Sequence, residues 1–166
     1  MNGTLSRINV RSFTDQAVSH ESVRKLLQAA MVAHSEGDER PWHFVVVEDK
    51  ATRVRIAYIH PYAHMVALAP VAILVCGDLT LQKHPGFWVQ DCAAATENIL
   101  IEAQSLGLGA VWLGIYPVEG RTQSFRNLFD LPSHVVPFAL TPIGYPAEQN
   151  GLKDQYDQSR VHFGRW

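Results

Sequence analysis

The sequence has few cysteines and no excess of either charge, and both absences limit what it can encode. Only Cys76 and Cys92 are present among 166 residues, and each lies in an apolar run. Two distant cysteines cannot build a disulfide framework or a cysteine-rich zinc site, so we expect buried thiols in a reducing compartment. The formal net charge is −2 at pH 7, which argues against duplex nucleic acid as the main partner.

Long apolar runs are absent too. No run approaches the roughly 20 apolar residues that a membrane-spanning helix needs, and residues 1–10 contain no apolar stretch of the kind found in signal peptides. We therefore expect a cytoplasmic protein that has no membrane partner. The chain is nevertheless 47% hydrophobic, which is enough for a well-formed core, and its length predicts a single domain over residues 1–166.

The motifs of several enzyme classes are missing. Gly107, Gly109 and Gly114 follow a helical pattern, whereas a dinucleotide-binding glycine motif follows a strand. The sequence has no phosphate-binding P-loop, no G-x-S-x-G motif and no evident pair of acid–base carboxylates. His60 and His64 could share one helical face, but no third acidic or thiol ligand follows at a suitable spacing. We therefore predict neither a metal site nor a catalytic side chain.

The most informative stretch that is present runs from Phe87 to Tyr116. Its first part is apolar on more than one helical face, which is typical of a helix buried between other elements, and we predict this helix over residues 87–106. A short apolar strand is expected at residues 110–115. A glycine inside a strand, such as Gly114, often marks a close approach of backbone or ligand. The pattern is equally compatible with a plain core helix and a plain core strand.

Elsewhere the pattern predicts helices that alternate with strands. Apolar residues three and four apart predict a first helix that Ser19 caps, and Asp49 is placed to cap a second helix over residues 50–59. Strands are expected at Trp42–Glu48, residues 71–77 and residues 138–143, and a helix of about ten residues follows Gly120. We expect the first strand to be central, because it is β-branched and apolar. This alternation predicts an α/β or α+β layered sheet.

Three polar residues near the N-terminus, Arg7, Asn9 and Arg11, occupy alternating positions. In an extended segment their side chains face one way. Guanidinium groups offer paired donors to anionic oxygens, so the row predicts a phosphate-binding site. The alternative is a solvated arm that binds no ligand.

Several segments, taken in order, resemble the FMN-dependent nitroreductase family over nearly the whole chain. Residues 7–15 are similar to the family's opening R-R-S-x-R-x-F, and residues 33–42 are similar to its A-P-S-x-x-N-x-Q-P-W. Residues 60–65 resemble a stretch that ends in a lysine in close relatives. The resemblance continues through Gln90–Asp91, Ala95, Asn98, Gly107–Gly114, Ile143–Pro146 and Ser159–Phe163. No single segment is specific, whereas their joint order is.

The resemblance implies an α+β, nitroreductase-like fold in which helices flank a central mixed β-sheet. It implies a homodimer with two FMN sites at the interface, and a C-terminal arm, about residues 147–166, that crosses to the partner subunit. It also implies an FMN-dependent oxidoreductase that takes a hydride from NADH or NADPH. This enzyme would reduce a small-molecule electron acceptor, such as a nitroaromatic or a quinone, by two-step exchange. Two alternatives remain open: a specialised relative that fragments flavin or removes halogen, and a non-enzymatic flavin-binding protein.

The resemblance also assigns residues that bind the cofactor. Arg7, Ile8, Asn9 and Arg11 would face the phosphate, ribityl chain and pyrimidine edge of FMN, and Arg160 would add to the phosphate site. Because the flavin N5 carries the chemistry, no side chain is expected to be catalytic.

Two further groups of residues are implied around the flavin ring. His34, Ser35 and Glu36 would approach it from the other subunit. Leu113 and Gly114 would lie beside the isoalloxazine, with a backbone N–H near N5.

This sequence departs from the family pattern at a few positions, which concern the substrate range more than the cofactor. Asn9 replaces serine, His34 replaces proline, Asp38 and Arg40 replace asparagine and glutamine, and His64 replaces lysine. Arg11 and, when protonated, His64 are expected to stabilise the negative charge that reduced flavin develops at N1.

Overall fold

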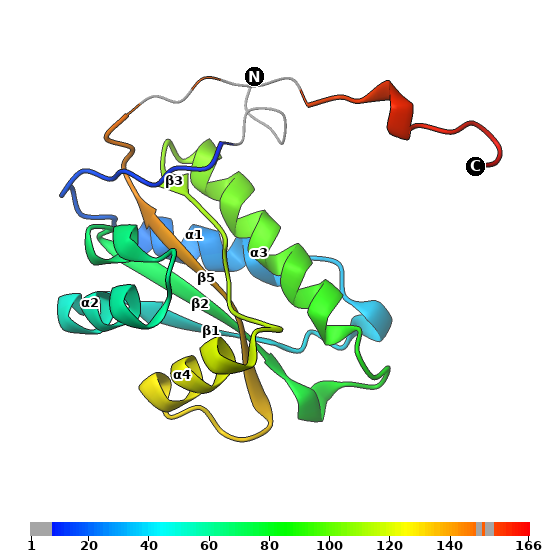
Figure 1. The fold of residues 1–166 in the computed structure, drawn as a ribbon, viewed down its shortest axis with the longest axis horizontal. Helices are drawn as coiled ribbons and strands as arrows, with labels where there is room; N and C mark the ends of the chain where they lie inside the picture. The colour runs from blue at the N-terminus through cyan, green and yellow to red at the C-terminus, as the bar shows by residue number, and fades with distance from the viewer. Residues whose placement is uncertain (1–7, 149–150, 152–154) are drawn as a thin grey trace.

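The computed structural model describes residues 8–148, 151 and 155–166, and its central feature is a five-stranded sheet with helices on both faces (Figure 1). The predicted α+β class is confirmed. The strands lie in the order β1 (Trp42–Val47), β2 (Val71–Asp78), β5 (Val135–Gly144) and β3 (Gly109–Ala110), and β4 (Leu113–Gly114) also pairs with β5.

The strand ladders are all antiparallel, and within the described residues the one parallel pairing is a bridge between Asn9 and Ala110. The resemblance implies a mixed sheet, and in the described part of the chain the parallel component of this sheet is the Asn9–Ala110 bridge. The prediction that residues 42–48 form a central strand is wrong, because β1 lies at an edge of the sheet. Trp42 packs in the apolar cluster on one face and Val47 in the cluster on the other, whereas His43 and Val46 between them are exposed, as suits a strand that pairs along one edge only.

The two faces of the sheet are covered by different helices (Figure 1). Strand β2 is buried on both faces: Ile73 lies in the apolar cluster with α1 and α3, and its neighbour Leu74 lies in the cluster with α2 and α4. This double burial explains why the strand is an unbroken apolar run. The helices are α1 (His20–Met31) and α3 (Trp88–Ser105) on one face, and α2 (Lys50–Ile59), α4 (Glu119–Phe129) and the short 3-10 helix η3 (His64–Ala67) on the other.

Helix boundaries follow the residues that were expected to set them. At the start of α1 the Ser19 hydroxyl accepts a hydrogen bond from a backbone N–H three residues on, and Asp49 does the same at the start of α2. Gly107 follows α3 with a φ of 72°, which suits glycine. The strand expected at residues 110–115 is instead split into the short strands β3 and β4, which both pair with β5.

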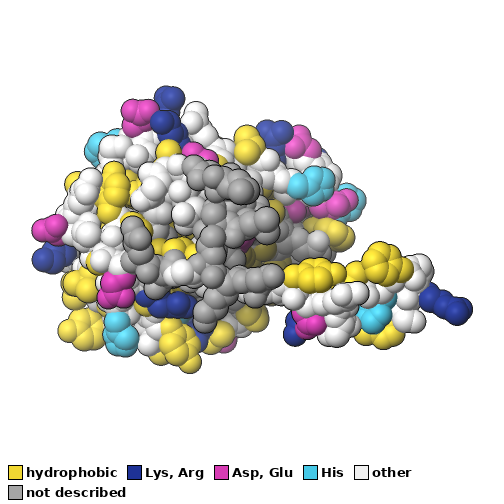
Figure 2. Space-filling model, turned by 90° about the horizontal axis from the view of Figure 1, so that it is seen from above, with side chains coloured by type: hydrophobic (Ala, Val, Ile, Leu, Met, Phe, Trp, Pro, Cys, Tyr) yellow, Lys and Arg dark blue, Asp and Glu magenta, His cyan; other side chains and the backbone are white. Residues whose placement is uncertain are grey.

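The C-terminal segment 155–166, which contains the short helix η5 (Gln158–Arg160), extends away from the sheet and its helices (Figures 1 and 2). Its large apolar side chains are exposed: the exposed fractions of Phe163 and Trp166 are 90% and 99%. The segment thus presents apolar surface that the described residues do not cover. Separately, none of the helices in the described part of the chain is long and apolar enough to cross a membrane.

Strand β3 lies so close to the N-terminal segment that a side chain does not fit between them. A Cβ on Gly109 would lie 2.6 Å from Val10 Cβ and from both Val10 methyl carbons. We therefore expect Gly109→Ala to lower the free energy of unfolding by about 1–3 kcal/mol, the usual cost of overpacking, as measured by urea denaturation.

Gly120→Ala is the matched control, because a Cβ there meets no atom within 4 Å. Alanine should not lower the free energy of unfolding at this position, because glycine loses more backbone conformational entropy on folding than alanine does. Equal stability of Gly109→Ala and the wild type would contradict this packing.

Candidate functional site

The N-terminal segment is built into the edge of the sheet. The Val10 N–H donates to the Ala110 carbonyl oxygen at 3.0 Å. Val10 is buried, whereas Asn9 and Arg11 on either side of it are exposed, as expected for an extended segment. A free solvated arm is therefore excluded for this part of the chain. Arg7 lies outside the described residues.

A turn from a distant part of the sequence packs on this segment. Met65 in η3 and Ile8 both pack against a small cluster of buried side chains. His64, the first residue of η3, is exposed. The structure thus brings four of the predicted site residues to the corner of the molecule that contains β3: Ile8, Asn9, Arg11 and His64.

Gly114 in β4 differs from the other glycines of the strands. At Gly77, Gly109 and Gly144, an added Cβ would lie 2.3 to 2.6 Å from a packed side chain. At Gly114 it would meet no atom within 4 Å, and the backbone φ is not in the left-handed region. The described residues therefore leave open space above Gly114, and their packing does not require glycine there.

Two side chains from different helices meet at the Gly114 carbonyl oxygen. His60 Nε2, just after α2, lies 3.0 Å from it, and Arg121 Nη1 in α4 donates to it at 2.9 Å. The next N–H, that of Ile115, donates to Phe138 on β5 at 3.1 Å. Because the backbone groups of successive strand residues point in opposite directions, the Gly114 N–H and C=O both face away from β5.

His60 is a neutral hydrogen-bond donor in this arrangement. Its side chain is 1% exposed, and its Nδ1 accepts the Tyr62 N–H at 3.2 Å, so the ring proton resides on Nε2 and is donated to Gly114. Burial lowers the pKa of His60, and the nearby Arg121 charge lowers it further. His60 therefore has a role different from that of the exposed His64.

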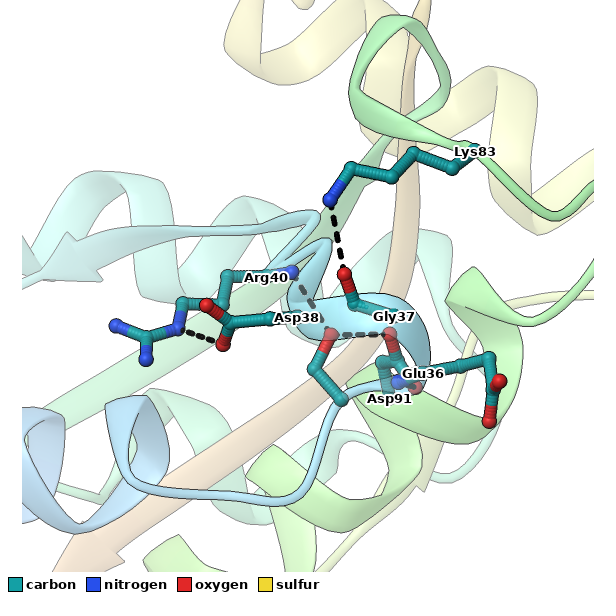
Figure 3. Close-up of polar contacts among 7 residues, drawn as sticks. Glu36, Gly37, Asp38, Arg40, Lys83 and Asp91 are labelled. Atoms are coloured by element: carbon teal, nitrogen blue, oxygen red, sulfur yellow. Dashed lines mark hydrogen bonds and ion pairs between the residues drawn. The ribbon is translucent and has the colours of Figure 1, made fainter.

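The residues expected to approach FMN from the other subunit lie in a loop that is fixed to the start of α3 (Figure 3). The Ser35 hydroxyl donates to one oxygen of the buried Asp91 carboxylate at 2.7 Å, and the Glu36 N–H donates to the other at 3.2 Å. The Arg40 N–H donates back to the Ser35 hydroxyl at 2.8 Å. His34 is exposed just before this contact. Asp91 thus positions the loop.

Two of the departures from the family pattern in this loop, Asp38 and Arg40, contact each other (Figure 3). Arg40 Nε lies 2.6 Å from Asp38 Oδ1 in an exposed ion pair. Asp38 and Arg40 both have left-handed φ values, 54° and 47°, as does Gly37 at 57°. Lys83 Nζ donates to the Gly37 carbonyl at 2.8 Å, and the buried Glu39 carboxylate accepts two backbone N–H groups from the same distant segment. These contacts hold the loop in its unusual backbone conformation.

Two groups of candidate residues, the loop with Ser35 and Glu36 and the N-terminal segment beside β3, lie near opposite ends of α3. Ser35 and Glu36 contact Asp91 in its first turn. Near its other end the Leu108 N–H donates to the Ala103 carbonyl at 2.8 Å, and the chain then enters β3 beside the N-terminal segment. At 1.5 Å per residue, Asp91 and Ala103 are about 18 Å apart along the helix. The two groups therefore do not form one compact site within a chain.

Arg160 lies apart from both groups, in the extended C-terminal segment (Figure 1). Its side chain is 84% exposed, and its Nε lies 3.0 Å from Asp157 Oδ2. The side-chain contact that the structure gives Arg160 within the described residues is with Asp157, an acidic residue of the same short segment.

His60 and Arg121 are not among the residues that the sequence predicts for the site. In the sequence, His60 and His64 could share a helical face but lack further metal ligands, and Arg121 belongs to no motif. The contacts of His60 and Arg121 with Gly114 span 54 and 7 positions, so no local pattern links them to that residue.

The neutral state of His60 predicts a pH dependence of stability. The folded pKa lies below the ordinary value of 6.5, so the stabilisation is fully present above about pH 6.5 and is lost as the pH falls toward the folded pKa. His60→Gln keeps an N–H donor but does not titrate. We expect the free energy of unfolding of the wild type to fall relative to His60→Gln when urea denaturation is repeated from about pH 7.5 down to about pH 5. A difference that is independent of pH would contradict a buried neutral His60.

Comparison with known sequences adds an independent line of evidence. The sequence model of the nitroreductase family matches residues 5–72 and 60–145. A protein of Methanothermobacter thermautotrophicus, whose name proposes an NADH dehydrogenase or NAD(P)H nitroreductase, is 51% identical over 161 residues, which cover 97% of this chain and 84% of that relative.

Solved structures share the fold. An FMN-dependent nitroreductase from Clostridium difficile has a TM-score of 0.92 at 27% identity, and the match covers 100% of both chains. A structure from Desulfovibrio desulfuricans, described as a proposed nitroreductase in complex with FMN, has a TM-score of 0.82 at 31% identity and covers 96% of this chain and 92% of that one. From the family match and the relative that is 51% identical, the chain belongs to the nitroreductase family.

Proposed function

We propose that this protein is an NAD(P)H-dependent FMN oxidoreductase whose flavin lies over the Gly114 backbone. The family assignment supports the cofactor and the reductant, as do the two structural relatives whose descriptions name FMN. Bound FMN would supply the hydride chemistry, and the chain would bind, orient and shield it. A nitroaromatic or a quinone fits this chemistry as the acceptor.

The observation that carries the proposal is the open space above Gly114. The packing of the described residues does not need glycine there, since an added Cβ would meet nothing within 4 Å. A planar ligand pressed against the backbone does need it, because a side chain would hold the ring away. The Gly114 N–H faces the outer edge of β4, where it can donate to a ring nitrogen of such a ligand.

The surrounding side chains suit the other parts of FMN. Asn9 and Arg11 are exposed beside β3 and offer amide and guanidinium donors, which bind anionic oxygens well. Arg11 and His64 would stabilise negative charge at the pyrimidine end of the reduced flavin. Arg7 would contribute to the phosphate site from the start of the same segment.

We further propose a homodimer in which the loop at residues 34–36 completes the FMN site of the partner. The separation of the two groups along α3 supports this arrangement. The exposed Phe163 and Trp166 support it too, because burying apolar surface stabilises by about 25 cal/mol per Å². In such a dimer the C-terminal segment would cross to the partner and bring Arg160 to its phosphate site.

Gly114→Ala tests the flavin position directly. The added methyl group should weaken FMN binding by about ten- to a hundredfold, because this loss of affinity corresponds to the usual free-energy cost of overpacking a contact. Fluorescence titration of FMN measures the change. The free energy of unfolding of the apoprotein should hardly change, because the methyl meets no atom of the chain within 4 Å.

Gly120→Ala again serves as the control and should bind FMN like the wild type. If Gly114→Ala binds FMN with wild-type affinity, the flavin does not lie over this residue.

The dimer is tested by replacing Phe163 and Trp166 together with serine. Light scattering after gel filtration should then give the 18.5 kDa mass of one chain, whereas the wild type should give twice that mass. FMN binding should weaken with dissociation, and the circular dichroism spectrum should persist, because both side chains face solvent within the chain.

Tyr58→Ser is the control for loss of an exposed aromatic side chain, because Tyr58 on α2 is 86% exposed. This variant should remain a dimer. An FMN-loaded wild-type monomer would refute the arrangement.

A further inference from the structure

Arg121 stands at the edge of the proposed flavin site and is held there from two directions. Its Nη1 donates to the Gly114 carbonyl at 2.9 Å. Its guanidinium carbon lies 5.7 Å from the centre of the Tyr62 ring, within the range of a cation–π contact. These two contacts join α4, β4 and the turn after α2, so the guanidinium is positioned before any ligand binds.

Most of the hydrogen-bonding capacity of this guanidinium is unused. Arginine has five N–H donors, and the bond to Gly114 is the one that Arg121 makes within the described part of the chain. None of the ion pairs among the described residues includes Arg121. The neighbouring His60 is neutral, and its Nδ1 already accepts the Tyr62 N–H, so it offers Arg121 neither a counter-charge nor a free acceptor. In the part of the chain that the structure describes, this site therefore holds a preorganised positive charge that is not paired with a carboxylate.

The position of Arg121 indicates that this positive charge could bind a ligand. A molecule that exchanges electrons with the proposed flavin must approach it near the outward-facing Gly114 backbone, and the Arg121 guanidinium is held at the Gly114 carbonyl oxygen. Tyr62 is 67% exposed, so its ring offers an aromatic surface at the same place. A fixed guanidinium beside an aromatic ring is suited to a planar ligand with a carboxylate or phosphate group.

We propose that Arg121, backed by Tyr62, binds an anionic group of the molecule that reacts with the flavin. This group is a carboxylate on the electron acceptor or a phosphate of the pyridine nucleotide. The inference rests on the proposed FMN oxidoreductase function and deepens it, because it assigns a charge preference to the site.

The test compares FMN-loaded wild type, Arg121→Gln and Arg121→Lys in the two half-reactions, without oxygen. Reduction of the flavin by NADH is followed first, by stopped-flow absorbance. Reoxidation is then followed with 4-nitrobenzoate and with the neutral 4-nitrobenzyl alcohol. If Arg121 binds an acceptor carboxylate, Arg121→Gln should slow reoxidation by 4-nitrobenzoate about ten- to a hundredfold at low concentration and leave the neutral acceptor nearly unaffected.

If Arg121 instead binds a nucleotide phosphate, Arg121→Gln should weaken NADH binding by a similar factor and leave both acceptors unaffected. In either case Arg121→Lys should behave more like the wild type than Arg121→Gln does, because lysine keeps the positive charge. Arg126→Gln is the matched control: Arg126 lies on the same helix and donates to the Pro132 carbonyl, away from Gly114, so both half-reactions should be unchanged.

Two results would overturn the inference. One is unchanged kinetics of Arg121→Gln in both half-reactions. The other is equal slowing with charged and neutral acceptors, which would show that Arg121 only supports the Gly114 backbone. FMN titration of the wild type separates these results from failure of the proposed function, since a protein that binds no FMN fails before Arg121 is tested.

Discussion

The pairing of β5 along both of its edges is the constraint on which the rest of the structure depends. All ten residues of β5 are buried, and the strand pairs with β2 on one side and with β3 and β4 on the other. The residues that follow it hold the N-terminal segment, through a hydrogen bond from Thr14 to Tyr145 and a bridge between Phe13 and Pro146. The candidate site forms on the β3–β4 side, because β4 pairs only with β5 among the described strands and its other edge, with the Gly114 backbone, faces outward.

The site consists mainly of backbone groups and hydrogen-bond donors, which suits chemistry that a bound flavin carries. His60 and Arg121 contribute differently to it. The neutral His60 fixes the Gly114 carbonyl without adding charge in a buried place, where an unpaired charge would be costly. Arg121 fixes the same carbonyl and brings a positive charge to the edge of the site. The loop at residues 35–40 is fixed separately, by Asp91, so the two ends of α3 present different parts of the proposed binding surface.

Local signals in the sequence predicted the features that local interactions determine. The caps at Ser19 and Asp49 set the starts of two helices, and the resemblance identified the family that the comparisons confirm. The edge position of β1 could not be predicted, because an apolar run does not show how many edges of the strand are paired, and β1 has exposed residues between its buried ends. The contacts of His60 and Arg121 with Gly114 were equally hidden, since they depend on how α2 and α4 pack on the sheet. A glycine within the strand suggested a close approach there, but only the packing shows that the space above it is open.

The visible absorption spectrum during anaerobic reduction tests the central claim most directly. Purified protein would be loaded with FMN, freed of excess flavin and mixed with NADH or NADPH in the absence of oxygen. We predict bound flavin whose absorbance one or both nucleotides bleach, and which a nitroaromatic or a quinone then restores. Flavin that binds but is bleached by neither nucleotide would indicate a flavin-binding protein without this activity. A protein that retains no flavin at all would contradict the claim that Gly114 and its surroundings form an FMN site.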